Sequence, residues 1–249
     1  PHFDSYDVFL LQGMGSRRWQ ISAQQDDRFI ADAPLRILRN FQPEQEWVLA
    51  AGDMLYLPPK YAHNGIAEDD CMTYSIGFRA PSHYELMTQF LVYLQDKIET
   101  EGWYSDPGLQ LQSHPSKISA AMQSQVISIL KKIRWNRDDI ENFLGIYLSE
   151  PKPHVFFEQP LKPLSPRLFL QQIKKNGVQL ALKSRMLSGN NKFFINGEVY
   201  LVGSNSFKTL LNLADNQEFF PSPHIDEETE KILYQWYVSG YIVSKNQAI

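Results

Sequence analysis

The sequence contains a single cysteine, Cys71, among its 249 residues. One cysteine cannot form a disulfide within the chain, so the fold has to be held by its core rather than by cross-links. A chain without disulfides fits a reducing compartment, and the cytoplasm is the expected location. Cys71 has no nearby histidine or other base to activate its thiol, and we expect it to be structural.

Long apolar runs and an excess of basic residues are also missing. No apolar stretch approaches the roughly 18 residues that a membrane-spanning helix needs, so no membrane partner is expected. Lysine and arginine number 24 against 28 aspartates and glutamates, a formal net charge of −4, which argues against direct DNA binding. The apolar content of 43% suffices for one large domain or two to three small ones.

Three residues suggest a metal site. His2 and Asp4 are two positions apart, and in an extended strand such side chains point to the same face. His63 follows a stiff Pro58-Pro59 bend, which suits a ligand that has to be held in place. Two histidines and one carboxylate leave open positions on an octahedral metal, the arrangement of non-haem Fe(II) oxygenases. We therefore predict a metal site at His2, Asp4 and His63.

The predicted strand Arg17–Ser22 places two neighbouring arginines on opposite faces. Strand parity allows Arg17 to point inward while Arg18 points to solvent. An inward arginine in an apolar barrel needs an anion, and a dicarboxylate cosubstrate would supply one with bidentate geometry. The alternative is a buried ion pair with an aspartate, either Asp7 or Asp53.

Further short strands complete an all-β segment over residues 1 to 80. Met72–Phe78 reads as the closing strand, and Thr73 and Ser75 share one of its faces. That face is polar enough to line a pocket, although cross-strand hydrogen bonding is an equally good explanation for both hydroxyls. The other predicted strands are His2–Gln12, Glu46–Ala50 and Asp53–Leu57.

Residues 81 to 150 change to helical periodicity. Ser82 is the expected cap of the first helix, whose apolar positions run to Ile98. The stripes of these helices fit either an internal core or an interface. The other two predicted helices are Ser119–Arg134 and Arg137–Ser149.

Residues 151 to 249 begin with a linker of five prolines and then alternate helices and strands. Asn196-Gly197 predicts a hairpin turn between two apolar runs. The set is winged-helix-like, and its mixed charge favours a solvated face over a DNA-binding one. The expected elements are helices at Ser165–Asn176, Ser206–Ala214 and Glu227–Ser239, and strands at Val178–Leu187 and Tyr241–Val243. His83, His114, His154 and His224 have no partner at ligand spacing and are expected to be structural.

The runs PHFDSYDVFLLQGMGSRRWQI, AGDMLYLPPKYAHNG and MTYSIGFRAP resemble the JmjC-type ribosomal oxygenases of bacteria, which are arginine hydroxylases. The resemblance covers essentially the whole chain. It implies that Fe(II) binds His2, Asp4 and His63, that Arg17 pairs with 2-oxoglutarate, and that a small polar residue, Ser75 or Thr73, also contacts this cosubstrate. The resemblance also implies that O2 is consumed together with 2-oxoglutarate. The family has a long segment before the His-x-Asp strand, so we expect an N-terminal part, with early barrel strands, to be lacking here.

The fold class implied is mixed α+β. Residues 1–80 would be the C-terminal part of a double-stranded β-helix (jelly-roll, cupin-like) JmjC barrel, 81–150 a helical dimerisation segment, and 151–249 a winged-helix-like domain. The implied function is hydroxylation of an arginine at Cβ in a large-subunit ribosomal protein by a homodimeric enzyme. Alternatives are a JmjC histidine hydroxylase or lysine demethylase, and a non-catalytic module that binds ribosomal protein.

Overall fold

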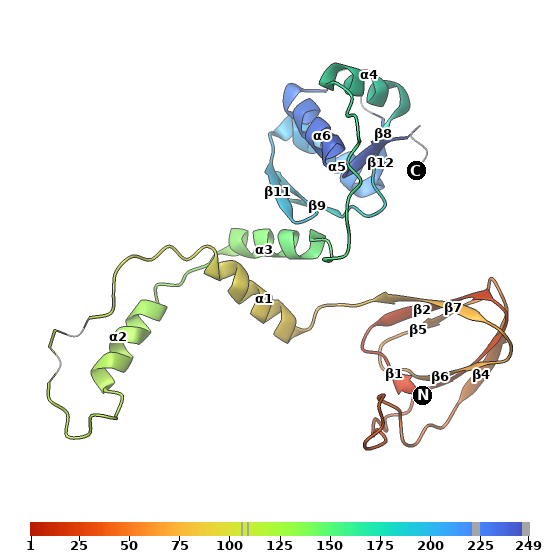
Figure 1. Ribbon diagram of the computed structural model, residues 1–249, viewed down its shortest axis with the longest axis horizontal. Coiled ribbons are helices and arrows are strands. Elements are labelled where there is room, and N and C mark those ends of the chain that lie inside the picture. The colour runs from red at the N-terminus through yellow and green to blue at the C-terminus, as the bar shows by residue number, and fades with distance from the viewer. Residues whose placement is uncertain (106, 109, 221–224, 246–249) are drawn as a thin grey trace. The chain divides into compact units, whose positions relative to one another are not determined.

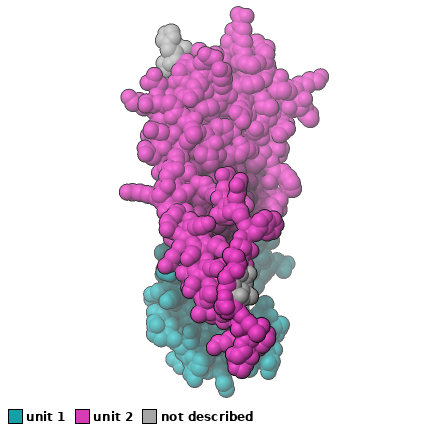
Figure 2. All heavy atoms as spheres, turned by 90° about the vertical axis from the view of Figure 1, so that its left-hand side faces the viewer, with its two compact units in different colours: residues 1–86 teal, residues 87–249 magenta. Residues whose placement is uncertain are grey.

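The computed structural model describes residues 1–105, 107–108, 110–220 and 225–245. Two compact units make up the chain, Pro1–Leu86 and Met87–Ile249, which Figure 2 distinguishes by colour. No helix in the described part of the chain is both long and apolar enough to span a membrane. The helices and strands are labelled in Figure 1.

The first unit consists of two antiparallel sheets whose inner faces meet. One sheet has the strand order β1-β6-β3-β4 and the other β5-β2-β7. Their shared core consists of large apolar side chains from three strands, as in sandwich and jelly-roll folds. The core residues are Val8, Leu10, Trp19, Ile21 and Leu57. The strands are β1 (His2–Phe3), β2 (Asp7–Met14), β3 (Arg17–Ser22), β4 (Gln45–Leu49), β5 (Met54–Leu57), β6 (Ala62–Ala67) and β7 (Met72–Phe78).

Alternation along the strands explains this core. The burial of β2 alternates along Asp7–Met14, with Val8, Leu10 and Gln12 buried. A register shift between Gln12 and Met14 marks a bulge. Gly15, at φ +62, then turns the chain into β3, and a Cβ there would lie 2.3 Å from the carbonyl oxygen of Asp70.

The second unit has its core around six short strands and three helices. Most of this core is fully buried and is formed by residues 169 to 242. Its largest buried side chains include Phe169, Ile173, Phe193, Leu213 and Trp236. The elements are α1 (His83–Gln95), which begins in the first unit, α2 (Ala120–Leu130), α3 (Arg137–Ser149), α4 (Pro166–Asn176), β8 (Val178–Leu180), β9 (Met186–Gly189), β10 (Lys192–Ile195), β11 (Glu198–Leu201), α5 (Ser204–Asn216), β12 (Glu218–Phe219), α6 (Glu227–Val238) and β13 (Ile242–Ser244).

Local signals explain where two of these helices begin. Asn136 accepts from the N–H of Asp139, whose carboxylate accepts from the Asn136 N–H, so α3 starts with a capping box. Ser165 caps α4 and Pro166 occupies its first turn. Helix α2 differs from both, because none of its residues is buried although its sequence is mostly apolar.

Several predicted boundaries were wrong. The strand predicted over His2–Gln12 is interrupted at residues 4–6, because β1 and β2 belong to different sheets and the chain bends between them. The prediction missed β6, and it merged β8 and β9 into one strand. The predicted strands Arg17–Ser22 and Met72–Phe78 and the predicted helix Arg137–Ser149 have the bounds of β3, β7 and α3. The division into 1–80, 81–150 and 151–249 remains a prediction.

Candidate metal centre

Strand pairing brings the three predicted ligands together. β1 pairs with β6 so that His2 lies directly opposite His63, and their ring centroids are 4.2 Å apart. Asp4 follows β1 and lies beside both rings. Its Oδ1 is 4.0 Å from His2 Nε2 and its Oδ2 is 3.5 Å from His63 Nε2. One ligand atom from each residue falls within 4.8 Å of the others, and this is the only such group among the described residues.

The local chain fixes how His63 presents its ring. Its Nδ1 lies 3.0 Å from the carbonyl oxygen of Tyr61, and since a carbonyl can only accept, Nδ1 carries the proton. The Lys60 N–H donates to the Asp4 carbonyl at 2.9 Å, which ties this bend to the end of β1. A backbone carbonyl on one ring nitrogen commonly orients the other nitrogen toward a metal.

Asp4 and His63 together favour a cation between them. The His63 side chain is only 3% exposed, and burial lowers its pKa, so the ring is neutral at pH 7. With the proton on Nδ1, the Nε2 lone pair faces a carboxylate oxygen at 3.5 Å. Two lone pairs at that distance repel each other unless a positive charge lies between them. The ligand atoms of an octahedral ion with bonds of about 2.1 Å lie about 3 Å apart, so a small movement of the exposed His2 ring would complete the set.

Arg17 lies on the inner face of β3, where parity predicted it. It shares that face with Trp19, and its guanidinium carbon is 5.8 Å from the centre of the Trp19 ring. Its Nη2 donates to Cys71 Sγ at 3.5 Å, and its buried Nε has no hydrogen-bond partner among the described residues. A buried donor without a partner is costly, and a carboxylate ligand would satisfy it.

The alternative ion pair with Asp7 or Asp53 is not formed within the described residues. Asp7 accepts from the Tyr56 hydroxyl at 2.6 Å, and Asp53 accepts from the Ala50 N–H at 2.8 Å. Arg18, on the outer face, pairs with two glutamates instead. Its partners are Glu46 at 2.9 Å and Glu68 at 2.6 Å.

Comparison with known proteins agrees with this geometry. Residues 1–86 match the JmjC domain, and residues 132–242 match the ROXA-like winged helix. The chain joins a JmjC domain to a ROXA-like winged helix. The fold class and the family resemblance expected from the sequence are thereby confirmed.

Individual relatives support the same assignment. The ribosomal protein uL16 3-hydroxylase of Escherichia coli K12 is 28% identical over 200 residues, which cover 80% of this chain and 54% of that protein. A probable ribosomal oxygenase of Haemophilus influenzae is 38% identical over 127 residues, covering 49% of this chain and 30% of the relative. The chain thus spans about half the length of the first of these relatives.

A solved structure extends the likeness across nearly the whole chain. It is the ribosomal oxygenase YcfD of Escherichia coli in complex with cobalt and 2-oxoglutarate. The TM-score is 0.72 with 26% identity, and the match covers 97% of this chain and 65% of that chain.

The two hydroxyls predicted on the closing strand lie on the inner side of the JmjC domain. The register of β7 on β2 places Thr73 opposite Gln12 and Ser75 opposite Leu10. Thr73 Oγ1 donates to Gln12 Oε1 at 2.7 Å, which is the cross-strand role weighed as the alternative. Ser75 is exposed. Their contact with a cosubstrate remains a prediction.

Sequence reasoning missed Gln12 and the packing of Trp19 in this interior. Gln12 is 1% exposed and binds Thr73, and its inward position follows from its parity with Val8 and Leu10, a signal that was available. Trp19 lies 6.1 Å from the His63 ring, and only Gly65 leaves room for its indole, since a Cβ there would be 2.7 Å from it. No sequence pattern gives that packing.

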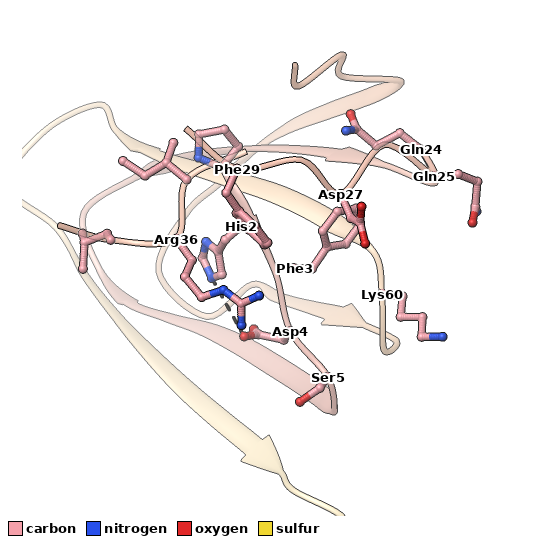
Figure 3. Close-up of a pocket in the computed structure, with 13 residues that line it drawn as sticks. His2, Phe3, Asp4, Ser5, Gln24, Gln25, Asp27, Phe29, Arg36 and Lys60 are labelled. Atoms are coloured by element: carbon pink, nitrogen blue, oxygen red, sulfur yellow. Dashed lines mark ion pairs between the residues drawn. The ribbon is translucent and has the colours of Figure 1, made fainter. Parts of the chain in front are cut away.

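A cavity of about 840 Å³ opens beside the predicted ligands in the JmjC domain. Figure 3 shows His2 and Asp4 turned toward each other at its wall. The rest of its lining is mixed and includes Phe29, Arg36, Asp27 and Lys60. Its volume is that of a small-molecule or side-chain site. His83, His114 and His154 lie outside the cluster, and His224 falls outside the described residues.

Proposed function

We propose that this chain carries the metal centre of an Fe(II)- and 2-oxoglutarate-dependent hydroxylase that modifies an arginine at Cβ in a large-subunit ribosomal protein. The observation that carries the proposal is the neutral His63 Nε2 facing the Asp4 carboxylate beside His2. Similarity to a uL16 3-hydroxylase and to a probable ribosomal oxygenase supports it. A ribosomal substrate makes the cytoplasm the expected place of action.

The chain's own residues hold and orient the reactants. His2, Asp4 and His63 would hold Fe(II), and three ligands leave positions for 2-oxoglutarate and O2. With these bound, the metal and cosubstrate supply the oxygen-insertion chemistry, while the protein supplies position and a dry cavity. Arg17 would bind the far carboxylate of 2-oxoglutarate through its unpartnered Nε. The buried Trp19, between Arg17 and His63, would keep water away from this side of the site.

The charge of the first unit suits a cationic substrate. Residues 1 to 80 contain eleven aspartates and glutamates against seven lysines and arginines. Asp27, at the wall of the cavity, is exposed and offers a carboxylate to a guanidinium group. The aromatic wall at Phe29 would pack on the aliphatic part of an arginine side chain.

Residues 81–150 are proposed to form a homodimer interface. Helix α2 has no buried residue, and its large apolar side chains are 38% to 58% exposed. A helix with so apolar a sequence needs a partner surface. A second copy of the chain would cover it in an isologous contact. The exposed side chains are Met122, Val126, Ile127, Ile129 and Leu130.

Turnover with analysis of the product tests the proposal. The chain would be incubated aerobically with Fe(II), 2-oxoglutarate and large-subunit ribosomal protein uL16. We expect succinate release above the His63→Ala control and the gain of one oxygen atom on an arginine, located by tandem mass spectrometry. An oxygen on histidine would identify a histidine hydroxylase instead, and loss of methyl groups from lysine would identify a demethylase. Metal binding without any release of succinate would contradict the hydroxylase assignment and favour a non-catalytic module that binds ribosomal protein.

A further inference from the structure

The strand β11 has a free edge. It lies at one end of the three-stranded sheet β11-β10-β9, and nothing within the described residues pairs with its outer side. Figure 1 labels β11 at the border of the C-terminal fold. Most proteins protect such an edge with lysine, proline or a bulge. The sequence of β11, Glu-Val-Tyr-Leu, has no such protection.

Register shows which backbone groups are available on that edge. Asn196 and Gly197, at φ 52 and 86, form a two-residue turn, so Ile195 and Glu198 are a hydrogen-bonded pair. Hydrogen-bonded and non-hydrogen-bonded residue pairs alternate along two antiparallel strands. The hydrogen bond from the Val202 N–H to the Asn191 carbonyl falls where this alternation predicts a hydrogen-bonded pair. Of the three residues between these pairs, Tyr200 also faces β10, and the N–H and C=O groups of the other two turn away from it. These residues are Val199 and Leu201.

A groove runs along the same edge. It has a volume of about 650 Å³ and lies between β11 and the first half of α6. Leu201 is 75% exposed and Val199 is 40% exposed, which gives the groove an apolar strip beside free backbone groups. The lining residues are Val199, Tyr200, Leu201, Glu227, Glu228, Lys231 and Ile232.

The rim of the groove is acidic. Glu228 Oε2 accepts from the Gly203 N–H and the Ser206 hydroxyl, and these bonds leave its negative charge in place. Glu198, the first residue of β11, accepts from the hydroxyls of two tyrosines, which also leave its negative charge in place. Among the described residues, Lys231 is the one cation that lines the groove, and it pairs with Glu227 at 2.7 Å. Positive charge on a partner would therefore be attracted to this edge.

We propose that β11 and this groove bind an extended segment rich in lysine and arginine, which adds a fourth strand to the sheet. Main-chain hydrogen bonds to Val199 and Leu201 would give affinity, an apolar side chain would cover Leu201, and basic side chains would reach Glu227 and Glu228. The site lies in the second unit and is separate from the metal centre. The identity of the partner rests on the proposed function, because a ribosomal protein substrate would supply such a basic segment.

Fluorescence anisotropy with the 249-residue chain tests the site directly. The probe is a fluorescein-labelled eight-residue peptide of alternating lysine and valine. We expect saturable binding that weakens with added salt. A peptide of alternating glutamate and valine, and a lysine–valine peptide N-methylated at alternate backbone nitrogens, should both bind much more weakly. Equal binding of the N-methylated peptide would overturn the strand-addition geometry.

Variants separate this groove from other acidic surface. Leu201→Asp should weaken binding by about tenfold or more, since it places a charge on the apolar strip. Leu182→Asp is the matched control, because Leu182 is 88% exposed, belongs to the same unit and does not line the groove. Glu227→Lys should also weaken binding of the lysine–valine peptide and reduce the salt dependence of its affinity. Amide exchange at Val199 and Leu201 should slow when the peptide binds.

The outcomes bear on this site and not on the hydroxylase assignment. The binding assay needs no metal, so a failure to bind peptide would refute the β11 site without refuting the hydroxylase function. Peptide binding without turnover would refute the hydroxylase function and not the β11 site. The proposal is overturned if Leu182→Asp weakens peptide binding as much as Leu201→Asp does. The proposal is also overturned if no peptide binds and sedimentation shows a dimer for the wild type but a monomer for Leu201→Asp, because a second copy of the chain would then occupy the edge.

Discussion

His63 shows how a single side chain acquires its chemistry from its surroundings. The Tyr61 carbonyl fixes the proton on Nδ1, burial keeps the ring neutral, and pairing with β1 sets its Nε2 against Asp4. The sequence predicted the residue types and the strand of His2. It could not show that Asp4 lies past the end of β1, because the bend between two sheets depends on pairing with β6 rather than on local sequence.

Arg17 and Arg18 give a prediction at this scale. Arg17→Ala should weaken 2-oxoglutarate binding by about 2–5 kcal/mol, roughly 30-fold to several thousand-fold, because a buried charge-assisted pair is lost from one side. Fe(II) binding should change little. Titration calorimetry with 2-oxoglutarate and a redox-inert divalent metal measures both.

Arg18→Ala is the matched control for that measurement. Its ion pairs with Glu46 and Glu68 are exposed, and such pairs contribute about 0–1 kcal/mol. We expect 2-oxoglutarate affinity close to that of the wild type. Equal losses from the two substitutions would refute the face assignment of β3.

At the scale of single elements, helix α3 depends on its first turn. Asn136→Ala should lower the free energy of unfolding by about 1 kcal/mol, because the Asp139 N–H loses its acceptor. Urea unfolding followed by helical circular dichroism reports on it. Asn205→Ala, near the exposed start of α5, should leave the midpoint nearly unchanged. A midpoint shift of the same size in both variants would show that the cap is not the cause.

Asp139 makes the same helix sensitive to acid. The Lys97 ammonium at 2.6 Å, and then the Asn136 N–H, hold the pKa of this carboxyl below its usual value. A lowered folded pKa means that its stabilising contribution is present above the unfolded pKa, about 4, and is lost as pH falls through the folded value.

Asp139→Asn should therefore reduce the fall in the urea midpoint between about pH 6 and about pH 3. Asp138, whose pKa is lowered chiefly by Lys192, would account for part of what remains. If the urea midpoint falls equally in the wild type and in Asp139→Asn, the Asp139 carboxyl is not a cause of the acid sensitivity.

Local signals decided which elements could be predicted. Arg137–Ser149 was predicted because its helical periodicity lies within the segment itself, and the structure adds a local start signal in the capping box of Asn136. β6 was missed because Ala62–Ala67 has little apolar alternation, and it is a strand only because β1 and β3 pair with it on either side. Asn196-Gly197 gave the hairpin through its positive φ angles. The free edge of β11 depends on the order of strands in the sheet, which local sequence does not give.

At the scale of the whole molecule, the proposed dimer makes a direct prediction. Changing Val126 and Ile129 to glutamate places two charges on the apolar face of α2. Obligate interfaces bury about 2,000 Å² or more, so the variant should sediment as a folded monomer while the wild type sediments as a dimer. Ser124→Glu with Ser128→Glu puts the same charges on the opposite face and should leave the dimer intact. A wild-type chain that sediments as a monomer at tens of micromolar would refute the interface.

The proposed function depends on one metal site formed by His2, Asp4 and His63. The most direct measurement is an anaerobic calorimetric titration of Fe(II) into the wild-type chain, His63→Ala and His83→Ala, with circular dichroism to show that each is folded. We expect one ion per chain for the wild type and for His83→Ala, whose exposed ring lies outside the cluster, and loss of that site in His63→Ala. Stoichiometric Fe(II) binding by folded His63→Ala would contradict it.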